Sequence, residues 1–289
     1  MGRVTLDFES KLAQPAWNEA KTVCVLLLGE LYGMTRVRQR LVEAGHRFAT
    51  DVDAELIVHL YEDCGDNFVD HLNGCFAGAI WQPHSEELIL FNDPIGSRSL
   101  FYALVGDRVL FSSGVRALLA EPSLPRARDP VAIAQMLQFE YMLDSRTYLA
   151  AVKVLAPATV MHCCKGEVTA SRRYCRLVHT PLQQFLPEAE LLERLYAHLA
   201  TAFERQAPGA LPAGINLSGG LDSRMVMALW LQFAGDAPMQ TFTFGAPGAD
   251  DVHLAAELAS ISHSAHTSVL LRPDFVQRWR TNASGAPTG

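Results

Sequence analysis

A single stretch, residues 214–229, constrains the second half of the chain more than any other part of the sequence. It begins as a short apolar run, breaks at Ser218-Gly219-Gly220, and resumes with apolar residues at helical spacing. This pattern predicts a strand, a glycine turn and a helix that runs to about Phe233. The main-chain N–H groups of a helix N-terminus bind anions, and glycines let a phosphate approach the backbone closely. A carboxylate in the same turn, Asp222, is suited to hold Mg²⁺ against that phosphate.

The pattern alone leaves an ordinary strand-to-helix turn open, because Ser, Gly and Asp populate such turns in general. The Walker signature GxxxxGK[ST] is absent, so the usual nucleotide loop is excluded. The stretch closely resembles SGGxDS, the pyrophosphate loop of the ATP-pyrophosphatase superfamily. The resemblance implies ATP and Mg²⁺ as cofactors, with Asp222 as the metal ligand. The implied nucleotide-binding residues are Leu217, Ser218, Gly219, Gly220, Asp222 and Ser223.

Length and composition exclude several classes of protein. At 289 residues the chain is long enough for two domains with separate cores. A net charge of −7 argues against a general affinity for nucleic acid or an anionic membrane. The apolar run at residues 23–28 is far too short to span a bilayer. Six cysteines are too few in a chain of this length to indicate a disulfide framework. The N-terminus also lacks the pattern of a signal peptide, so we expect a cytoplasmic protein.

The first half combines predicted strands with pairs of predicted helices, which favours a layered α+β domain over residues 1–180. Turn residues at positions 83–85, 94–96 and 106–107 predict hairpins between successive strands. A helix is expected at 129–139, with Asp129 as its cap and Pro130 in its first position. The predicted strands are residues 22–28, 76–81, 87–91, 99–105, 109–112, 159–162 and 167–172.

The second half alternates strands and helices, which favours a parallel α/β sheet over residues 188–289. Residues 181–187 have the character of a linker between the two domains. After the glycine turn described above, we expect a strand at 240–244, a helix at 252–261 and a strand at 267–271, with an amphipathic helix at 188–202 before them.

Several motifs of the first half are similar to class II glutamine amidotransferase domains. They include Gly29-Glu30-Leu31-Tyr32, the stretch LNGCFA at 72–77 and the stretch FNDPIGSRSLFY at 91–102. Such a domain followed by SGGxDS is the layout of the asparagine synthetase family. The resemblance implies an Ntn-type glutaminase-like fold for residues 1–180. It implies an ATP-pyrophosphatase fold, similar to the adenine nucleotide α-hydrolases, for residues 188–289.

The resemblance also implies a site for the substrate glutamine, with contacts from Arg3, Glu30 and Asp53. Two departures from the family's motifs weaken the prediction of a working glutamine site. Position 2 is Gly where the family has its nucleophilic cysteine, and Leu28 stands in place of the motif's first asparagine. We therefore expect no glutaminase activity, and we expect the chain to be truncated at both ends relative to the family, since a GEGADE-like loop is also absent.

Two further residue groups of the second half have competing interpretations. Phe244, in a segment similar to the family's second strand, is a candidate adenine contact, and a core aromatic is at least as good an interpretation. Asp250 and Asp251 match the family's helix start, and plain N-terminal capping is the favoured interpretation for them.

Three hypotheses for function remain open. The first is an ATP-dependent amide ligase that adenylates a small-molecule carboxylate (aspartate in a true synthetase) before an amine donor attacks. The second is a ligase of the β-lactam synthetase or lasso-peptide cyclase kind, which uses an internal amine. The third is a non-catalytic nucleotide-binding fragment or scaffold. Either a homodimer or docking on a full-length paralogue fits the sequence, and nucleic acid and membrane partners are not expected.

Overall fold

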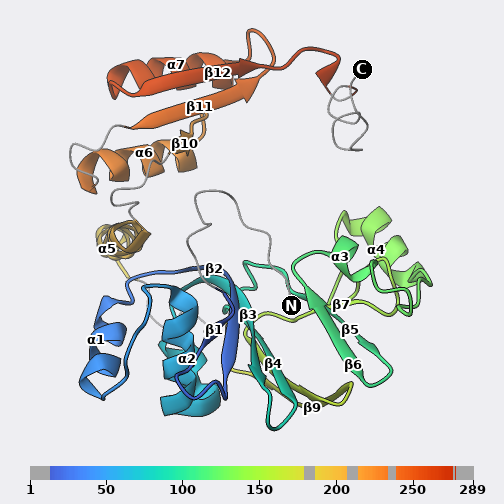
Figure 1. Cartoon of the computed structure of the whole chain (residues 1–289). Helices are drawn as coiled ribbons and strands as arrows, with labels where there is room; N and C mark the ends of the chain where they lie inside the picture. The colour runs from blue at the N-terminus through green and yellow to red at the C-terminus, as the bar shows by residue number, and fades with distance from the viewer. Residues whose placement is uncertain (1–13, 179–185, 207–213, 234–238, 276, 278–289) are drawn as a thin grey trace. The chain divides into compact units, whose positions relative to one another are not determined.

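The computed structural model describes residues 14–178, 186–206, 214–233, 239–275 and 277 (Figure 1). The chain divides into two compact units, Met1–Pro181 and Leu182–Gly289, and each is described by itself. Among the described helices, none combines the length and the apolar character needed to cross a membrane.

The first unit contains two antiparallel sheets (Figure 1). The larger has the order β1-β2-β3-β4-β8-β9, with strands Ala16–Trp17, Cys24–Leu31, Gly74–Gln82, Glu87–Asn92, Thr159–Cys164 and Glu167–Arg173. The smaller has the order β6-β5-β7, with strands Arg108–Ser112, Phe101–Val105 and Lys153–Val154. The helices are α1 (Thr35–Glu43), α2 (Asp53–Cys64), the 3₁₀ helix η2 (Gly65–His71), α3 (Val115–Leu118) and α4 (Pro130–Phe139).

The central strands β3 and β4 of the larger sheet are buried on both faces. Successive side chains of a strand point to opposite faces, so each of the two strands contributes to two cores. One set of β3 and β4 side chains packs with α2: Phe76, Ile80, Ile89 and Phe91. The alternate set packs with residues of the smaller sheet: Ala77, Ala79, Leu88 and Leu90. The far face of the smaller sheet packs with Leu118 of α3. The order helix–sheet–sheet–helix confirms the predicted layered α+β domain.

A hairpin at residues 94–96 was one of three expected, and this prediction is wrong. β4 and β5 lie in different sheets, so the chain crosses between sheets at this point. The crossing is fixed by the fully buried carboxylate of Asp93, which accepts hydrogen bonds from the main-chain N–H groups of Phe76 (3.0 Å), Ile95 (3.0 Å) and Ser97 (3.0 Å). A buried carboxylate with several N–H donors is well satisfied and holds the segment in one conformation. The other two hairpins, β3–β4 and β5–β6, form as predicted.

The helix at Pro130–Phe139 also forms as predicted. Asp129 is its N-cap, and its side chain accepts from the main-chain N–H groups of Val131 (2.9 Å) and Ala132 (3.2 Å). Arg146 donates to the second oxygen of the same carboxylate at 2.7 Å. The cap therefore joins α4 to the segment that follows it.

The second unit is a three-stranded parallel sheet with the order β10-β11-β12 (Figure 1). Its elements are α5 (Glu188–Gln206), β10 (Gly214–Asn216), α6 (Leu221–Phe233), β11 (Gln240–Gly245), α7 (Asp250–Ile261) and β12 (Ala265–Leu270). A core of Ile215, Leu217, Met227, Trp230 and Ala255 joins β10 to α6 and α7. The predicted parallel α/β arrangement is confirmed for these residues.

His162 on β8 lies between two carboxylates from separate elements. Its Nε2 atom is 2.8 Å from Oδ2 of Asp66 in η2, and its Nδ1 atom is 2.8 Å from Oε1 of Glu87 in β4. Burial lowers the pKa of His162, but the two carboxylate contacts outweigh it, and the pKa is raised above its ordinary value of 6.5. The charged imidazolium therefore ties three elements of the first unit together.

We expect this histidine to stabilise the first unit most at low pH. A group whose folded-state pKa is raised contributes stability that is fully present below its unfolded-state pKa and is lost as pH rises through the folded-state pKa. The variant His162→Gln should therefore lower the melting temperature more at about pH 5.5 than at about pH 8.5. Thermal unfolding at both pH values measures this, with the exposed His84→Gln as the control. An equal loss of stability at the two pH values would contradict the prediction.

Candidate functional site

The stretch Leu217–Ser223 consists of a tight loop after β10 and the first three residues of α6, which begins at Leu221. The buried Leu217 extends the sheet, since its main-chain N–H donates to the carbonyl oxygen of Phe242 at 2.8 Å. The Ser223 hydroxyl accepts from the N–H of Ser218 (3.1 Å) and lies 3.0 Å from the Ser218 hydroxyl. The Ser218 hydroxyl accepts in turn from the N–H of Gly220 (3.2 Å). The two serines thus hold the loop closed against the first turn of α6.

Gly219 lies against the next helix of the unit. Its N–H donates to Oδ1 of Asp251 on α7 at 3.0 Å. A Cβ atom at this position would lie 2.7 Å from Cδ1 of Leu254 and 2.9 Å from the same Asp251 oxygen. A larger residue here would therefore have to push the side chains of Leu254 and Asp251 aside, which would disturb the contact with Asp251.

The favoured interpretation of Asp251 as a helix cap is wrong. The N-cap of α7 is Ala249, which makes no side-chain cap hydrogen bond, and the helix begins at Asp250. The Asp251 carboxylate accepts from the N–H of Gly219 instead, across the junction between the two helices. The alternating order of strands and helices in the sequence could have predicted this contact, because in a parallel sheet it brings the starts of successive helices to one edge.

This edge of the sheet is positively polarised by the backbone and carries three acidic side chains, Asp222, Asp250 and Asp251. The first N–H groups of a helix have no partner within the helix, and the helix dipole favours an anion beside them. α6 and α7 both begin after neighbouring parallel strands, at the strand ends where ligands of α/β sheets bind. Asp222 is exposed in the first turn of α6, and Asp251 lies in the first turn of α7. The arrangement can bind an anion at the backbone and a divalent cation at the carboxylates.

Phe244 lies on the opposite face of β11 from the core. Thr241 and Thr243 are buried, whereas Phe242 and Phe244 are 42% and 55% exposed. The interpretation of Phe244 as a core aromatic is therefore wrong for the described part of the chain, and its ring is accessible to a ligand.

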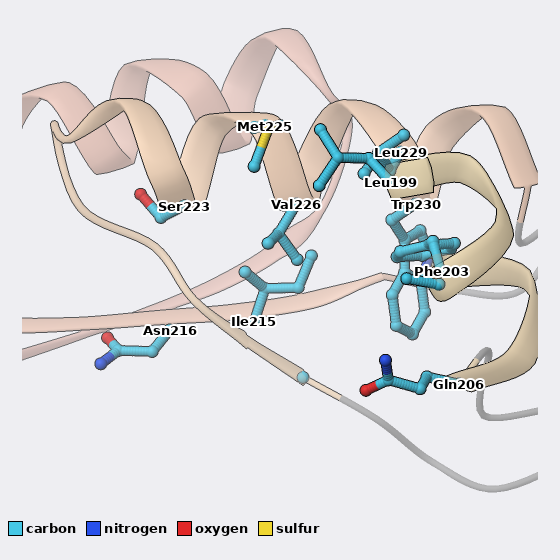
Figure 2. Close-up of a pocket in the computed structure, with 12 residues that line it drawn as sticks. Leu199, Phe203, Gln206, Ile215, Asn216, Ser223, Met225, Val226, Leu229 and Trp230 are labelled. Carbon is cyan, nitrogen blue, oxygen red and sulfur yellow. The ribbon is translucent and has the colours of Figure 1, made fainter. Parts of the chain in front are cut away.

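An apolar cleft of about 520 Å³ lies beside the loop, between α5, β10 and α6 (Figure 2). Its wall includes Phe203, Ile215, Val226 and Trp230. Of the loop residues, only Ser223 lines it. Because its surface is mainly apolar, the cleft is unsuited to phosphate groups, and the anion site is the loop itself.

In the first unit, Glu30 and Asp53 lie near one another at the ends of β2 and α2. Oδ2 of Asp53, in the first turn of α2, accepts from the N–H of Leu31 at 3.1 Å. Burial raises the pKa of Asp53, and the nearby charge of Glu30 adds to this. Arg3, the third residue predicted for this site, lies outside the described residues.

The backbones of β2 and β3 approach closely beside Glu30. Gly29 has φ +104°, and a Cβ there would lie 2.0 Å from the carbonyl oxygen of Cys75. Tyr32 lies next to the same cysteine: burial first, then its contacts with Cys75 and the charge of Glu30, raise the pKa of Tyr32 to about 12. Sequence reasoning named neither Tyr32 nor Cys75 as part of this cluster, because the register that brings Cys75 opposite Glu30 is set by strand pairing.

Comparison with known proteins gives matches for both units. Residues 3–175 match the family model described as a glutamine amidotransferase domain, and residues 194–281 match the model described as asparagine synthase. The chain is 24% identical over 261 residues to asparagine synthetase [glutamine-hydrolyzing] 1 of Bacillus subtilis (strain 168), covering 90% of this chain and 41% of the relative. It is 28% identical over 229 residues to asparagine synthetase [glutamine-hydrolyzing] 3 of the same organism, covering 77% of this chain and 36% of the relative.

The chain thus spans less than half the length of these relatives. Among solved structures, the chain is similar to glutamine phosphoribosylpyrophosphate amidotransferase from B. subtilis, complexed with ADP and GMP. The match covers 96% of this chain and 55% of the amidotransferase chain. The sequence identity is 15% and the TM-score 0.42, and a likeness at this level carries no argument.

The contact between Gly219 and Asp251 should protect the Gly219 amide from hydrogen exchange. A hydrogen bond to a charged group contributes about 1.5–3 kcal/mol, so the variant Asp251→Ala should speed exchange of this amide roughly 10- to 100-fold. NMR-detected hydrogen exchange measures it, and Asp250→Ala, which removes the neighbouring exposed carboxylate, is the matched control. If both variants leave the Gly219 rate unchanged, the hydrogen bond does not hold the loop.

Proposed function

The chain belongs to the asparagine synthetase family, and from this premise we propose that it acts in ATP-dependent amide formation through the loop Leu217–Ser223. Its two units carry the glutamine amidotransferase and asparagine synthase domains of that family, in that order. The single observation that supports the proposal best is the closed loop at the start of α6, in which the N–H of Gly219 is held by Asp251 of the neighbouring helix.

The loop has the features that binding a pyrophosphate group requires. Its two glycines remove side chains from the approach to the backbone, and the first turn of α6 supplies N–H donors and a favourable dipole. In this proposal the residues that contact the phosphates are Leu217, Ser218, Gly219, Gly220 and Ser223. The exposed ring of Phe244 is the proposed adenine contact.

The acidic side chains at this edge fit Mg²⁺, since it prefers carboxylate oxygens and the oxygens of bound phosphate. Asp222 is the proposed ligand, because it is exposed in the same turn as the phosphate site. Asp251 is a further candidate, although it already accepts from Gly219. A bound Mg²⁺ would neutralise charge on the phosphates.

The proposed reaction begins with a small-molecule carboxylate, aspartate in a true synthetase. One oxygen of this carboxylate attacks the α-phosphorus of ATP, and the bond from the α-phosphorus to the bridging oxygen breaks to release pyrophosphate. An amine donor then attacks the activated carbonyl, the bond from this carbon to the AMP oxygen breaks so that AMP leaves, and the amine nitrogen loses a proton to solvent. The N–H groups of residues 217–220 already donate within the protein, so the N–H donors at the departing pyrophosphate come from the first turn of α6, which the closed loop holds in place without reorganisation during the reaction.

The location and the assembly of the protein are further parts of this proposal. All six cysteines are free, which fits a reducing cytoplasm. A homodimer, or docking on a full-length paralogue, remains the proposed assembly, and light scattering of the purified chain distinguishes a dimer from a monomer.

Calorimetric titration with ATP and Mg²⁺ tests the nucleotide site directly. We expect the wild-type chain to bind ATP and the variant Asp222→Ala to bind at least about tenfold more weakly, because the metal ligand is lost. The variant Glu257→Ala removes one exposed carboxylate from α7 and should bind like the wild type. Absence of ATP binding by a folded wild-type chain would refute the nucleotide site. Equal weakening of binding by both variants would show that Asp222 acts only through its charge and is not a metal ligand.

Absence of glutamine hydrolysis is a separate prediction. Burial raises the pKa of the Cys24 thiol, and it raises that of Cys163 to about 11, so neither is a ready thiolate nucleophile. Leu28 also stands in place of the asparagine in the amidotransferase motif. We expect ammonia release from glutamine at the background rate in a coupled assay. Release well above background would contradict this, and its loss in the variant Cys75→Ser would then identify the nucleophile beside Tyr32.

A further inference from the structure

The first unit contains a second cluster of polar side chains, at the opposite end of α2 from Asp53. It consists of His46, from the connection between α1 and α2, and His59 and Glu62, both on α2. Glu62 lies nine positions after Asp53, which corresponds to roughly 14 Å along a helix. The cluster is therefore separate from the predicted glutamine contacts.

Three potential ligand atoms converge in this cluster. Nδ1 of His46 lies 3.1 Å from Nδ1 of His59, which lies 3.2 Å from Oε2 of Glu62. The same Glu62 oxygen is 3.8 Å from Nδ1 of His46. A tetrahedral Zn²⁺ ion with bonds of about 2.0–2.1 Å places neighbouring ligand atoms roughly 3.3 Å apart. The three distances bracket that value.

The outer nitrogen of His46 is within hydrogen-bond distance of a carboxylate, whereas the outer nitrogen of His59 lies farther from one. Nε2 of His46 is 2.8 Å from Oδ1 of Asp63, and Nε2 of His59 is 4.0 Å from Oε1 of Glu55. With Nε2–H of His46 donating to Asp63, Nδ1 of a neutral His46 ring carries a lone pair that can bind a cation. Nδ1 of His46, Nδ1 of His59 and Oε2 of Glu62 therefore face one another, and a cation placed between them could take all three as ligands.

The hydrogen bonds around the cluster are those expected of outer-shell partners at a metal site. Besides the contact of Asp63 with His46, the buried Asn18 donates to Oε1 of Glu62 at 2.7 Å and leaves Oε2 for the cluster. His59 is 1% exposed and its Nε2 atom has no hydrogen-bond partner among the described residues. Its ring is therefore fixed by packing and by what its Nδ1 atom binds.

The backbone also fixes the position of His46, the one residue of the cluster that lies outside α2. α1 ends in a Schellman motif, in which the N–H of His46 donates to the carbonyl oxygen of Leu41 and the N–H of Gly45 to that of Val42, both at 3.0 Å. Gly45 adopts φ +106°, which favours glycine. His46 is thus held at a fixed position next to α2, where His59 and Glu62 share one helix face at i and i+3.

We propose that His46, His59 and Glu62 form a binding site for a divalent transition-metal ion of the Zn²⁺ class, which joins the α1–α2 connection to α2. Two imidazoles and one carboxylate suit Zn²⁺, and the partly exposed side chains of His46 and Glu62 leave a fourth position for water. The site does not depend on nucleotide binding, so its test is independent of the proposed function.

The test is titration of the metal-free full-length chain with Zn²⁺, measured by competition with a chromophoric chelator and by thermal unfolding. One equivalent should bind and raise the melting temperature. The variants His46→Ala and Glu62→Gln, both at partly exposed positions, should weaken binding at least 100-fold and abolish the thermal shift. The variant Asp63→Asn should weaken binding 10- to 100-fold, as outer-shell changes do.

Two controls separate this site from other metal ligands of the chain. The variant His84→Ala removes an exposed histidine elsewhere in the first unit and should leave binding unchanged. Substitution with Co²⁺ should give a visible spectrum without a thiolate-to-cobalt charge-transfer band, which excludes the cysteines. Absence of stoichiometric binding, or binding that His46→Ala and Glu62→Gln leave unchanged, would overturn the proposal.

Discussion

Burial of the larger sheet's central strands on both faces determines how the rest of the first unit is arranged. β3 and β4 carry apolar side chains on both faces, so α2 must cover one face and the smaller sheet the other. The two strands also fit closely against their neighbours. A Cβ atom on Gly78 would lie 2.4 Å from Cζ of Phe91 and 2.6 Å from the carbonyl oxygen of Leu26. Close packing of this kind tolerates little change in volume, which makes the sheet a rigid base for the residues at its ends.

The polar clusters of the first unit lie where these buried elements end. Asp53 begins α2 and Glu62 lies in its last turn, so one buried helix positions a predicted glutamine contact and two of the three proposed metal ligands, His59 and Glu62. In the second unit, parallel pairing has a similar effect. It brings the starts of α6 and α7 to one edge of the sheet, where Gly219 meets Asp251. In both units a regular element fixes side chains that face other segments of the chain.

Carboxylates at these ends serve different purposes according to what surrounds them. Asp93 is fully buried and accepts several N–H groups, which fixes a change of sheet. Asp251 accepts one N–H and orders a loop. Asp222 is exposed, which suits a group that binds a ligand rather than the protein itself. Residue type alone does not distinguish these roles, because the number of donors around each carboxylate depends on the fold.

The sequence by itself determined the elements whose signals are local. The strand, loop and helix from Gly214 to Phe233 follow from apolar spacing and two glycines, and the cap at Asp129 follows from its place before Pro130. The tertiary structure decided whatever depends on partners distant in sequence. β4 and β5 belong to different sheets although a turn separates them, Asp251 contacts a residue 32 positions away, and Phe244 lies on the exposed face of its strand. The physical reason is that turn chemistry and periodicity act over a few residues, whereas the burial of a face and the partner of a carboxylate are set by strand pairing and helix packing.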